Sequence, residues 1–188
     1  MESLFEKALL FAIDAHSGMK RKSGEPYILH PIEVALIASK LTSDEEVISA
    51  AVLHDTVEDT DTTPDDILRN FGERVAYLVA LETENKRDGI PKRETWQIRK
   101  EESLEELKGA ADPGVRVVWL ADKLSNMRSF HKMYLEKGDS LWQSFHQSDP
   151  AKQAWYYRTV RDLTRELSDT PEWREYNTLT EKVFEGVK

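Results

Sequence analysis

The stretch AAVLHDTVEDT (Ala50–Thr60) ends an apolar helical run in an imidazole and a carboxylate, His54 and Asp55. Hiding an unpaired ion behind that much apolar surface costs several kcal/mol, so a buried ion needs a salt partner or a bound cation. No Lys or Arg occurs from residue 42 to residue 66, so the sequence offers no local basic partner. The pattern therefore predicts a helix whose end delivers a metal-binding pair.

Two further residues complete the predicted ligand set. His30 follows an apolar segment in PYILHPIEVA, and Asp122 follows another in VVWLADKLSNM. Two imidazoles and two carboxylates suit Mn²⁺, Fe²⁺ or Zn²⁺, whereas a chain without cysteine cannot offer thiolates. For His30 alone, a hydrogen-bonded core histidine is an equal alternative; the four residues together favour a metal site.

The composition is that of a folded protein inside the cell. The 188 residues are 39% apolar and 32% charged, which is typical of one domain with a proper core. No apolar run approaches the roughly 18 residues of a membrane span. Glu2 and Glu6 stand where a secretion signal carries positive charge. Because the chain also lacks cysteine, we expect a cytoplasmic protein with no membrane partner.

The charge distribution indicates the kind of ligand. A net charge of −9 argues against binding to a nucleic acid polymer. We expect a small, highly anionic substrate instead, because basic residues gather near the predicted ligands in sequence. For residues 86–93 a plain solvated surface is the favoured alternative. The basic residues concerned are Lys20, Arg21, Lys22, Lys86, Arg87, Lys92, Arg93, Arg99, Lys100, Lys123 and Arg128.

Nearly every segment has helical periodicity, which predicts an all-α fold. Val115 to Leu120 could form a buried strand, but apolar residues continue at helical spacing through Met127 and Phe130. Ser43 is the expected cap of the helix that carries His54. The expected helices cover residues 2–16, 31–41, 44–55, 64–70, 72–82, 95–108, 112–130, 150–167 and 171–186.

Helical spacing also predicts how the acids Asp55, Glu58 and Asp59 lie relative to His54. His54 and Glu58 are four residues apart, as are Asp55 and Asp59, so each pair shares a helix face if the helix continues. Glu58 and Asp59 would then project over an open coordination position of the cation, where they could orient and deprotonate a water molecule. The alternative is an acidic helix end in solvent.

A polar stripe marks the later helix. Asp122, Ser125, Asn126 and Ser129 lie on one face of an otherwise apolar segment. Buried polar groups need partners, which a wet metal pocket supplies. The alternative is that this stripe faces bulk solvent.

Four motifs together resemble the HD-domain metal-dependent phosphohydrolases, in particular the hydrolase domain of Rel/Spo alarmone enzymes and the stand-alone small alarmone hydrolases. These motifs are RKSGEPYILHP (Arg21–Pro31), AAVLHDTVEDTDTT (Ala50–Thr63), Phe71-Gly72 and LADKLSNMRS (Leu120–Ser129). The resemblance implies a helical bundle of about eight to ten helices in a single domain over residues 1–188. Its catalytic core would cover about residues 5–135, and a C-terminal helical extension would cover about 136–188.

The resemblance also implies roles for individual residues. One Mn²⁺ ion, with Fe²⁺ or Zn²⁺ as alternatives, would be bound by His30, His54, Asp55 and Asp122. The attacking water would be positioned and deprotonated by Glu58 and Asp59. The substrate would be contacted by Arg21, Lys22, Ser23, Tyr27, Asn126 and Arg128, with Tyr27 either stacking or packing structurally. The implied reaction removes pyrophosphate from the 3′ position of guanosine tetra- or pentaphosphate (ppGpp or pppGpp) to leave GDP or GTP.

Some features depart from the long Rel/Spo enzymes and leave alternatives open. Residues 81–107 lack the Thr-Lys pair common there, and Ser125 stands where many of those enzymes have His. The substrate could therefore be another nucleotide, in a 5′-nucleotidase, a dNTP hydrolase, an adenine alarmone hydrolase or an NADPH phosphatase. A catalytically silent nucleotide sensor is the alternative outside enzymes, and the oligomeric state stays open. The aromatic tail (residues 138–158) is expected to pack first and to line a base pocket second.

Overall fold

The all-α prediction is confirmed. The computed structural model describes residues 2–21, 24–87 and 89–187, and in these ranges the only strand-like pairing is an isolated bridge between Lys20 and Pro26. The helices described there are α1 (Leu4–Ala15), α2 (Leu29–Leu41), α3 (Glu45–Leu53), α4 (Thr56–Asp59), α5 (Pro64–Phe71), α6 (Glu73–Ala80), α7 (Lys92–Gly109), α8 (Gly114–Lys137), the 3-10 helix η1 (Gly138–Ser144), α9 (Pro150–Leu163), the 3-10 helix η2 (Arg165–Leu167) and α10 (Pro171–Val183).

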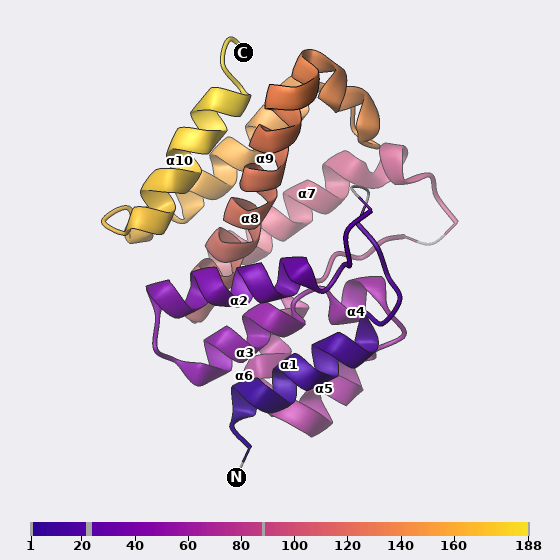
Figure 1. The fold of residues 1–188 in the computed structure, drawn as a ribbon, viewed down its shortest axis with the longest axis vertical. Helices are drawn as coiled ribbons and strands as arrows, with labels where there is room; N and C mark the ends of the chain where they lie inside the picture. Colours follow the sequence, from indigo (N-terminus) through magenta and orange to yellow (C-terminus); the bar gives the residue numbers. More distant parts are fainter. Residues whose placement is uncertain (1, 22–23, 88, 188) are drawn as a thin grey trace.

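The helices form two groups that meet along α2, α3 and α8 (Figure 1). In the first group α3 packs against α1, α2 and α6, and α5 packs against α6. In the second group α9 packs against α7, α8 and α10, and α10 also packs along α8. The two ends of the chain lie at opposite ends of the molecule (Figure 1). The contacts of α2 and α3 with α8 join the groups, and the four residues predicted to bind a metal lie on or next to these helices.

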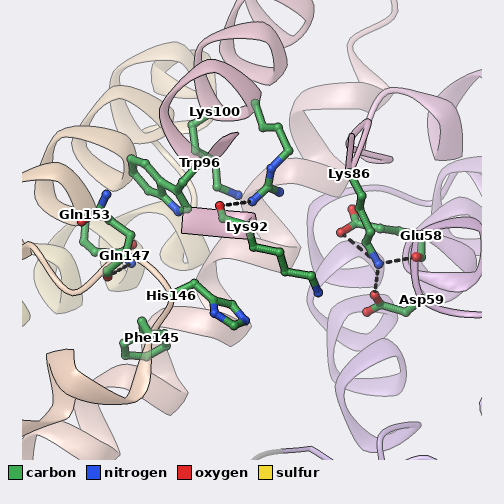
Figure 2. A pocket seen from close by; sticks show the side chains of 11 residues that line it. Glu58, Asp59, Lys86, Lys92, Trp96, Lys100, Phe145, His146, Gln147 and Gln153 are labelled. Atoms are coloured by element: carbon green, nitrogen blue, oxygen red, sulfur yellow. Dashed lines mark hydrogen bonds and ion pairs between the residues drawn. The ribbon is translucent and has the colours of Figure 1, made fainter. Parts of the chain in front are cut away.

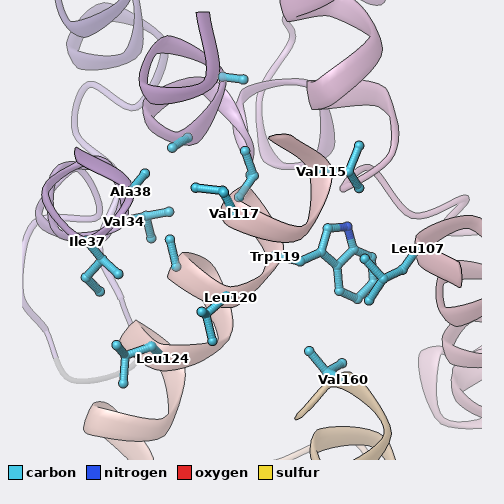
Figure 3. Packing of buried hydrophobic residues seen from close by; sticks show 14 of the residues in the cluster. Val34, Ile37, Ala38, Leu107, Val115, Val117, Trp119, Leu120, Leu124 and Val160 are labelled. Carbon is cyan, nitrogen blue, oxygen red and sulfur yellow. The ribbon is translucent and has the colours of Figure 1, made fainter. Parts of the chain in front are cut away.

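Helix α8 is the central element of the core (Figure 3). Val115, Leu120 and Leu124 are fully buried, and Trp119 is 1% exposed. The Trp119 indole nitrogen donates a hydrogen bond to the carbonyl oxygen of Leu81 at 3.3 Å. A helix surrounded by neighbours needs apolar residues on nearly every side, so its start lacks a clear helical period. This explains why residues 115–120 also resembled a strand, and that alternative is wrong.

Helix starts follow local capping chemistry. The predicted start at Pro64 is confirmed, because Thr63 and Asp66 form a reciprocal capping box. The predicted cap at Ser43 is wrong: Asp44 is the N-cap of α3, and its side chain accepts a hydrogen bond from the amide of Glu46. Helix α2 begins two residues before Pro31, at Leu29, which places His30 in its first turn.

The C-terminal helices cover α8 with aromatic side chains. The rings of Trp142 and Phe184 stack with centroids 5.3 Å apart, and Tyr157 packs on the edge of Phe130 at 5.4 Å. The predicted helix over residues 150–167 ends earlier, at Leu163, where a 3-10 segment replaces its last turn. The expected division into a core and an extension near residue 136 stays a prediction. None of the helices in the described ranges is long and apolar enough to cross a bilayer.

Candidate metal centre

Four side chains from three regions of the chain meet where α2, α3 and α8 come together. His30 lies in the first turn of α2, His54 and Asp55 form the turn between α3 and α4, and Asp122 lies midway along α8. His30 Nε2 is 3.0 Å from Asp122 Oδ1, and His54 Nε2 is 3.2 Å from Asp55 Oδ2. Each imidazole is 3.6 Å from the other carboxylate. Ligand atoms of His30, His54 and Asp122 all lie within 4.8 Å of one another, a group that could hold a metal ion.

Hydrogen bonds on the far side of each imidazole fix its orientation. His54 Nδ1 is 2.8 Å from the carbonyl oxygen of Ala51, which can only accept, so Nδ1 carries the proton. His30 Nδ1 is 2.9 Å from Ser125 Oγ, and that hydroxyl donates to Glu33 Oε2 at 2.8 Å. Ser125 Oγ therefore accepts from His30 Nδ1. Both Nε2 atoms are left with free lone pairs that face the centre, the orientation that a metal-ligating histidine requires.

The carboxylates and imidazoles shift one another's pKa. Burial alone disfavours a charged ring at His54, but the carboxylates of Asp55 and Asp122 raise its pKa well above the usual value. Burial also opposes ionisation of Asp55, yet the neighbouring His54 and His30 lower the pKa of Asp55. Both aspartates are thus held ionised while the site attracts positive charge. A proton on an imidazole or a divalent cation satisfies that demand.

The residues fit a divalent metal by an observation independent of their spacing. His54 Nε2 is buried and has no hydrogen-bond partner among the described residues, although it lies among carboxylate oxygens. A lone pair that faces carboxylate oxygens is repelled unless a proton or a metal cation lies between them, and the site therefore attracts one or the other. Two neutral imidazoles and two carboxylates are the mixed nitrogen and oxygen donor set of Mn²⁺, Fe²⁺ and Zn²⁺ sites.

The segment that carries His54, Asp55, Glu58 and Asp59 is divided into two helices, α3 and α4. The predicted continuous helix through His54 and Asp55 is wrong: α3 ends at Leu53, and α4 starts again at Thr56. The backbone of His54 and Asp55 stays in the right-handed helical region, and His54 Nε2 and Asp55 Oδ2 lie 3.2 Å apart.

The second predicted pair, Asp55 and Asp59, is brought together by a tyrosine. The Tyr27 hydroxyl lies 2.7 Å from Asp55 Oδ2 and 2.7 Å from Asp59 Oδ2. The Tyr27 ring is stacked on His16 with centroids 4.8 Å apart, and the Arg21 guanidinium lies 5.6 Å from the ring centre. Both of these contacts use the ring, and the predicted contact of Tyr27 with the substrate stays a prediction.

Glu58 and Asp59 are held from the opposite side by the chain after α6. The amide of Glu84 donates to Glu58 Oε2 at 3.1 Å, and Lys86 Nζ donates to Asp59 Oδ1 at 2.7 Å (Figure 2). Burial raises the pKa of Glu58 above its usual value, and the charges of Glu84 and Asp55 add to the rise. A carboxylate with a raised pKa is suited to accept a proton near neutral pH.

A basic pocket of about 220 Å³ opens beside these two acids (Figure 2). Half-buried Glu84 orders part of its wall, because its two carboxylate oxygens accept from Arg99 and Lys100. Within residues 86–93, the alternative of a plain solvated surface is wrong for Lys86, which is bound to Asp59, whereas Lys92 and Arg93 are exposed. In the aromatic tail, Trp142 is buried in the core as expected and Phe145 lines the pocket, while the binding of a nucleotide base there stays a prediction. The lining residues are Glu58, Asp59, Lys86, Lys92, Trp96, Arg99, Lys100, Phe145, His146, Gln147 and Gln153.

The predicted substrate contacts lie at different distances from the centre. Arg21 donates to Asn126 Oδ1 at 3.3 Å, and Asn126 donates to Asp122 Oδ1 at 2.8 Å, so this pair adjoins the metal ligands. Arg128 instead binds Glu33 and Glu175, which ties α8 to α2 and α10. Its role in substrate binding stays a prediction. Lys22 and Ser23 lie outside the described residues.

The predicted polar stripe on α8 faces the centre at its first two members. Asp122 is 4% exposed and Ser125 is 1% exposed, so the alternative that they face bulk solvent is wrong. Sequence reasoning missed the partners of this stripe, above all Lys123 and Glu82, which are both buried. A charged residue inside the apolar run of α8 was the only local signal for Lys123. Nothing in the sequence near Glu82 pointed to the metal centre.

Comparisons with known proteins agree with this geometry. The sequence profile of the family described as the HD domain matches residues 8–145. The guanosine-3′,5′-bis(diphosphate) 3′-pyrophosphohydrolase of Aquifex aeolicus is 41% identical over 136 residues, which cover 70% of this chain and 18% of that protein. A GTP pyrophosphokinase rsh of Brucella ovis is 40% identical over 138 residues, 72% of this chain and again 18% of the relative. The chain thus spans about a fifth of the length of these relatives.

Solved structures extend the likeness over the remaining helices. The lmo0812 protein of Listeria monocytogenes has a TM-score of 0.70 and 33% identity, covering 82% of this chain and 98% of that one. A metazoan ortholog of SpoT that hydrolyses ppGpp has a TM-score of 0.72 and 25% identity, covering 100% of this chain and 98% of that one. The second likeness includes the C-terminal helices, which lie beyond the family match.

Proposed function

Because this chain belongs to the HD-domain family, we propose that it is a metal-dependent hydrolase that removes pyrophosphate from the 3′ position of guanosine tetra- or pentaphosphate. The observation that carries the proposal is the position of Glu58 and Asp59, between the four-residue centre on one side and the basic pocket on the other. The Aquifex relative carries the name of this activity, and the metazoan neighbour hydrolyses ppGpp.

His30, His54, Asp55 and Asp122 are the proposed ligands of one Mn²⁺ ion, with Fe²⁺ and Zn²⁺ as alternatives. Their bare Nε2 atoms and ionised carboxylates support this assignment. When bound, such an ion supplies positive charge that offsets the charge of a phosphate and lowers the pKa of a coordinated water.

Glu58 and Asp59 are the proposed acid–base pair. Hydrolysis requires that a water molecule lose a proton as its oxygen attacks phosphorus, while the bond to the nucleotide O3′ breaks and that oxygen gains a proton. Glu58, whose pKa is raised by burial, is suited to orient the water and accept its proton. Asp59 is held by Tyr27 and Lys86 at hydrogen-bonding distance on two sides, which fixes its carboxylate beside Glu58.

The basic pocket is the proposed place of the substrate's anionic groups. Lys86, Lys92, Arg99 and Lys100 bring four cationic side chains to its wall in a protein whose net charge is −9. Such local concentration of positive charge attracts a multiply charged anion. Arg offers a bidentate fork to phosphate, whereas Lys is a point charge. We propose that the ligand is a small nucleotide and not a nucleic acid polymer. We also propose a cytoplasmic location, which is consistent with the cysteine-free composition.

The test is an incubation of the purified chain with Mn²⁺ and a panel of nucleotides, followed by separate detection of pyrophosphate and orthophosphate. Pyrophosphate and GDP from guanosine tetraphosphate are the expected products. Orthophosphate from NADPH or from a nucleoside monophosphate would replace this substrate with another one. Tight binding of guanosine tetraphosphate without any product would indicate a nucleotide sensor and contradict the hydrolase proposal.

A further inference from the structure

A buried ion pair lies directly behind one proposed metal ligand. Lys123 is 8% exposed, and its Nζ donates to Asp122 Oδ2 and to Glu82 Oε2, the latter at 3.3 Å. The Lys123 ammonium also lies 4.6 Å from the centre of the Trp119 ring. Glu82 is 8% exposed as well, and it comes from the chain just after α6. Three charged side chains thus form a row, Glu82–Lys123–Asp122, that ends at the metal centre.

The row divides the two oxygens of Asp122 between two tasks. Oδ1 faces the imidazoles, at 3.0 Å from His30 Nε2 and 3.6 Å from His54 Nε2. Oδ2 is bound to Lys123 on the far side. A carboxylate clamped in this way can offer only Oδ1 to a cation at the centre. Lys123 therefore fixes the rotation of the Asp122 carboxylate.

Lys123 also places a full positive charge next to a site that is proposed to bind a cation. An unbalanced ammonium there would weaken cation binding, because like charges repel strongly where solvent is excluded. Glu82 is the only other acid bound to Lys123 among the described residues, and in its ionised form it returns the row to a net charge of −1, the charge of Asp122 alone.

A purely stabilising role does not account for this arrangement. Buried ion pairs contribute little net stability relative to well-packed apolar residues. Glu82 Oε1 is buried without a hydrogen-bond partner in the described part of the chain, which is a cost to folding. A residue retained at such a cost calls for a functional explanation.

We infer that Glu82 is a positioning residue that neutralises Lys123 and thereby sets the affinity of the centre for a divalent cation. The inference rests on the metal centre proposed above. Partners of metal ligands in other proteins change metal affinity by about 10- to 100-fold when they are removed, and we expect a loss in that range for Glu82→Gln. Gln keeps the size of the side chain and removes only its charge.

Isothermal titration of the metal-free chain with Mn²⁺ alone tests the inference without reference to activity. The wild-type chain should bind one Mn²⁺, and Glu82→Gln should raise the dissociation constant by about 10-fold or more. Glu172→Gln is the matched control, because Glu172 is also 8% exposed but lies in α10. Its Mn²⁺ affinity should equal that of the wild type.

The double variant Glu82→Gln/Lys123→Met removes both charges. It should bind Mn²⁺ more tightly than Glu82→Gln, because the unbalanced ammonium is gone, and less tightly than the wild type, because Asp122 Oδ2 has lost its partner. Equal Mn²⁺ affinity of Glu82→Gln and the wild type, or a double variant that binds Mn²⁺ no more tightly than Glu82→Gln, would overturn the neutralising role of Glu82 alone. A wild-type chain that binds no Mn²⁺, Fe²⁺ or Zn²⁺ would overturn the metal centre itself.

Discussion

Replacing Tyr27 by Phe isolates the link between a proposed metal ligand and the proposed acid–base pair. The change removes only the hydroxyl that lies 2.7 Å from both Asp55 Oδ2 and Asp59 Oδ2. The ring stays, so its stacking on His16 at 4.8 Å is kept. We expect the fold and the Mn²⁺ stoichiometry to be unchanged.

The magnitude follows from the number of protons that the hydroxyl can give. A phenol has one proton and two charged acceptors here, so one full charge-assisted hydrogen bond is lost, worth about 1.5–3 kcal/mol. If Asp59 needs this bond in the transition state, kcat falls by about 10- to 100-fold. The KM for guanosine tetraphosphate should stay within about twofold, because the hydroxyl is engaged by the protein's own carboxylates.

Steady-state kinetics at saturating Mn²⁺, with calorimetric Mn²⁺ titration alongside, measures both quantities. Tyr77→Phe is the control, since Tyr77 is 42% exposed on α6 and its hydroxyl can be removed without effect on kcat. A tenfold rise in KM at constant kcat would instead make Tyr27 a substrate contact. Unchanged kcat and KM would refute the reasoning altogether.

Four other substitutions probe the remaining parts of the site and the core. Glu58→Gln should keep Mn²⁺ and lower kcat by about 100-fold or more, and a wild-type-like rate in the variant would exclude Glu58 as the base. Because burial raises the pKa of Glu58, the rate of the wild type should fall with decreasing pH at a pH above 4.5. Asp55→Ala should abolish Mn²⁺ binding, and stoichiometric Mn²⁺ by elemental analysis would contradict its role as a ligand. Arg21→Ala should chiefly raise KM for guanosine tetraphosphate, and an unchanged KM would return Arg21 to a surface role. Leu124→Ala, in the fully buried row of α8, should lower the unfolding free energy by about 2–5 kcal/mol in a urea titration, and a change under 1 kcal/mol would contradict tight packing there.

The metal centre shows which long-range relations a sequence can reveal. His30, His54 and Asp122 could be grouped because each ends or interrupts an apolar run, and burial of such groups is unfavourable unless they share a ligand. Helical periodicity was equally informative, since the apolar face of a helix must be buried whatever its partner is. Both arguments need only the cost of hiding polar groups and exposing apolar ones, which is a property of each segment by itself.

Local detail was predicted less well where two signals competed. Ser43 and Asp44 are both good N-cap residues, and the choice of Asp44 depends on the backbone at the start of α3. The end of α3 at Leu53 could not be predicted, because no Gly or Pro follows it in residues 54–63.

The lack of basic residues between positions 42 and 66 correctly indicated that the acids have no local partner, but it gave no information about distant ones. Lys86 reaches Asp59 from the chain after α6, and Glu82 reaches Lys123 across the core. Periodicity and composition therefore determined the helices and the four residues of the centre. Only the tertiary structure decided which charges neutralise which, because electrostatic partners are chosen by distance in space and by burial, and neither is encoded in the spacing of residues along the chain.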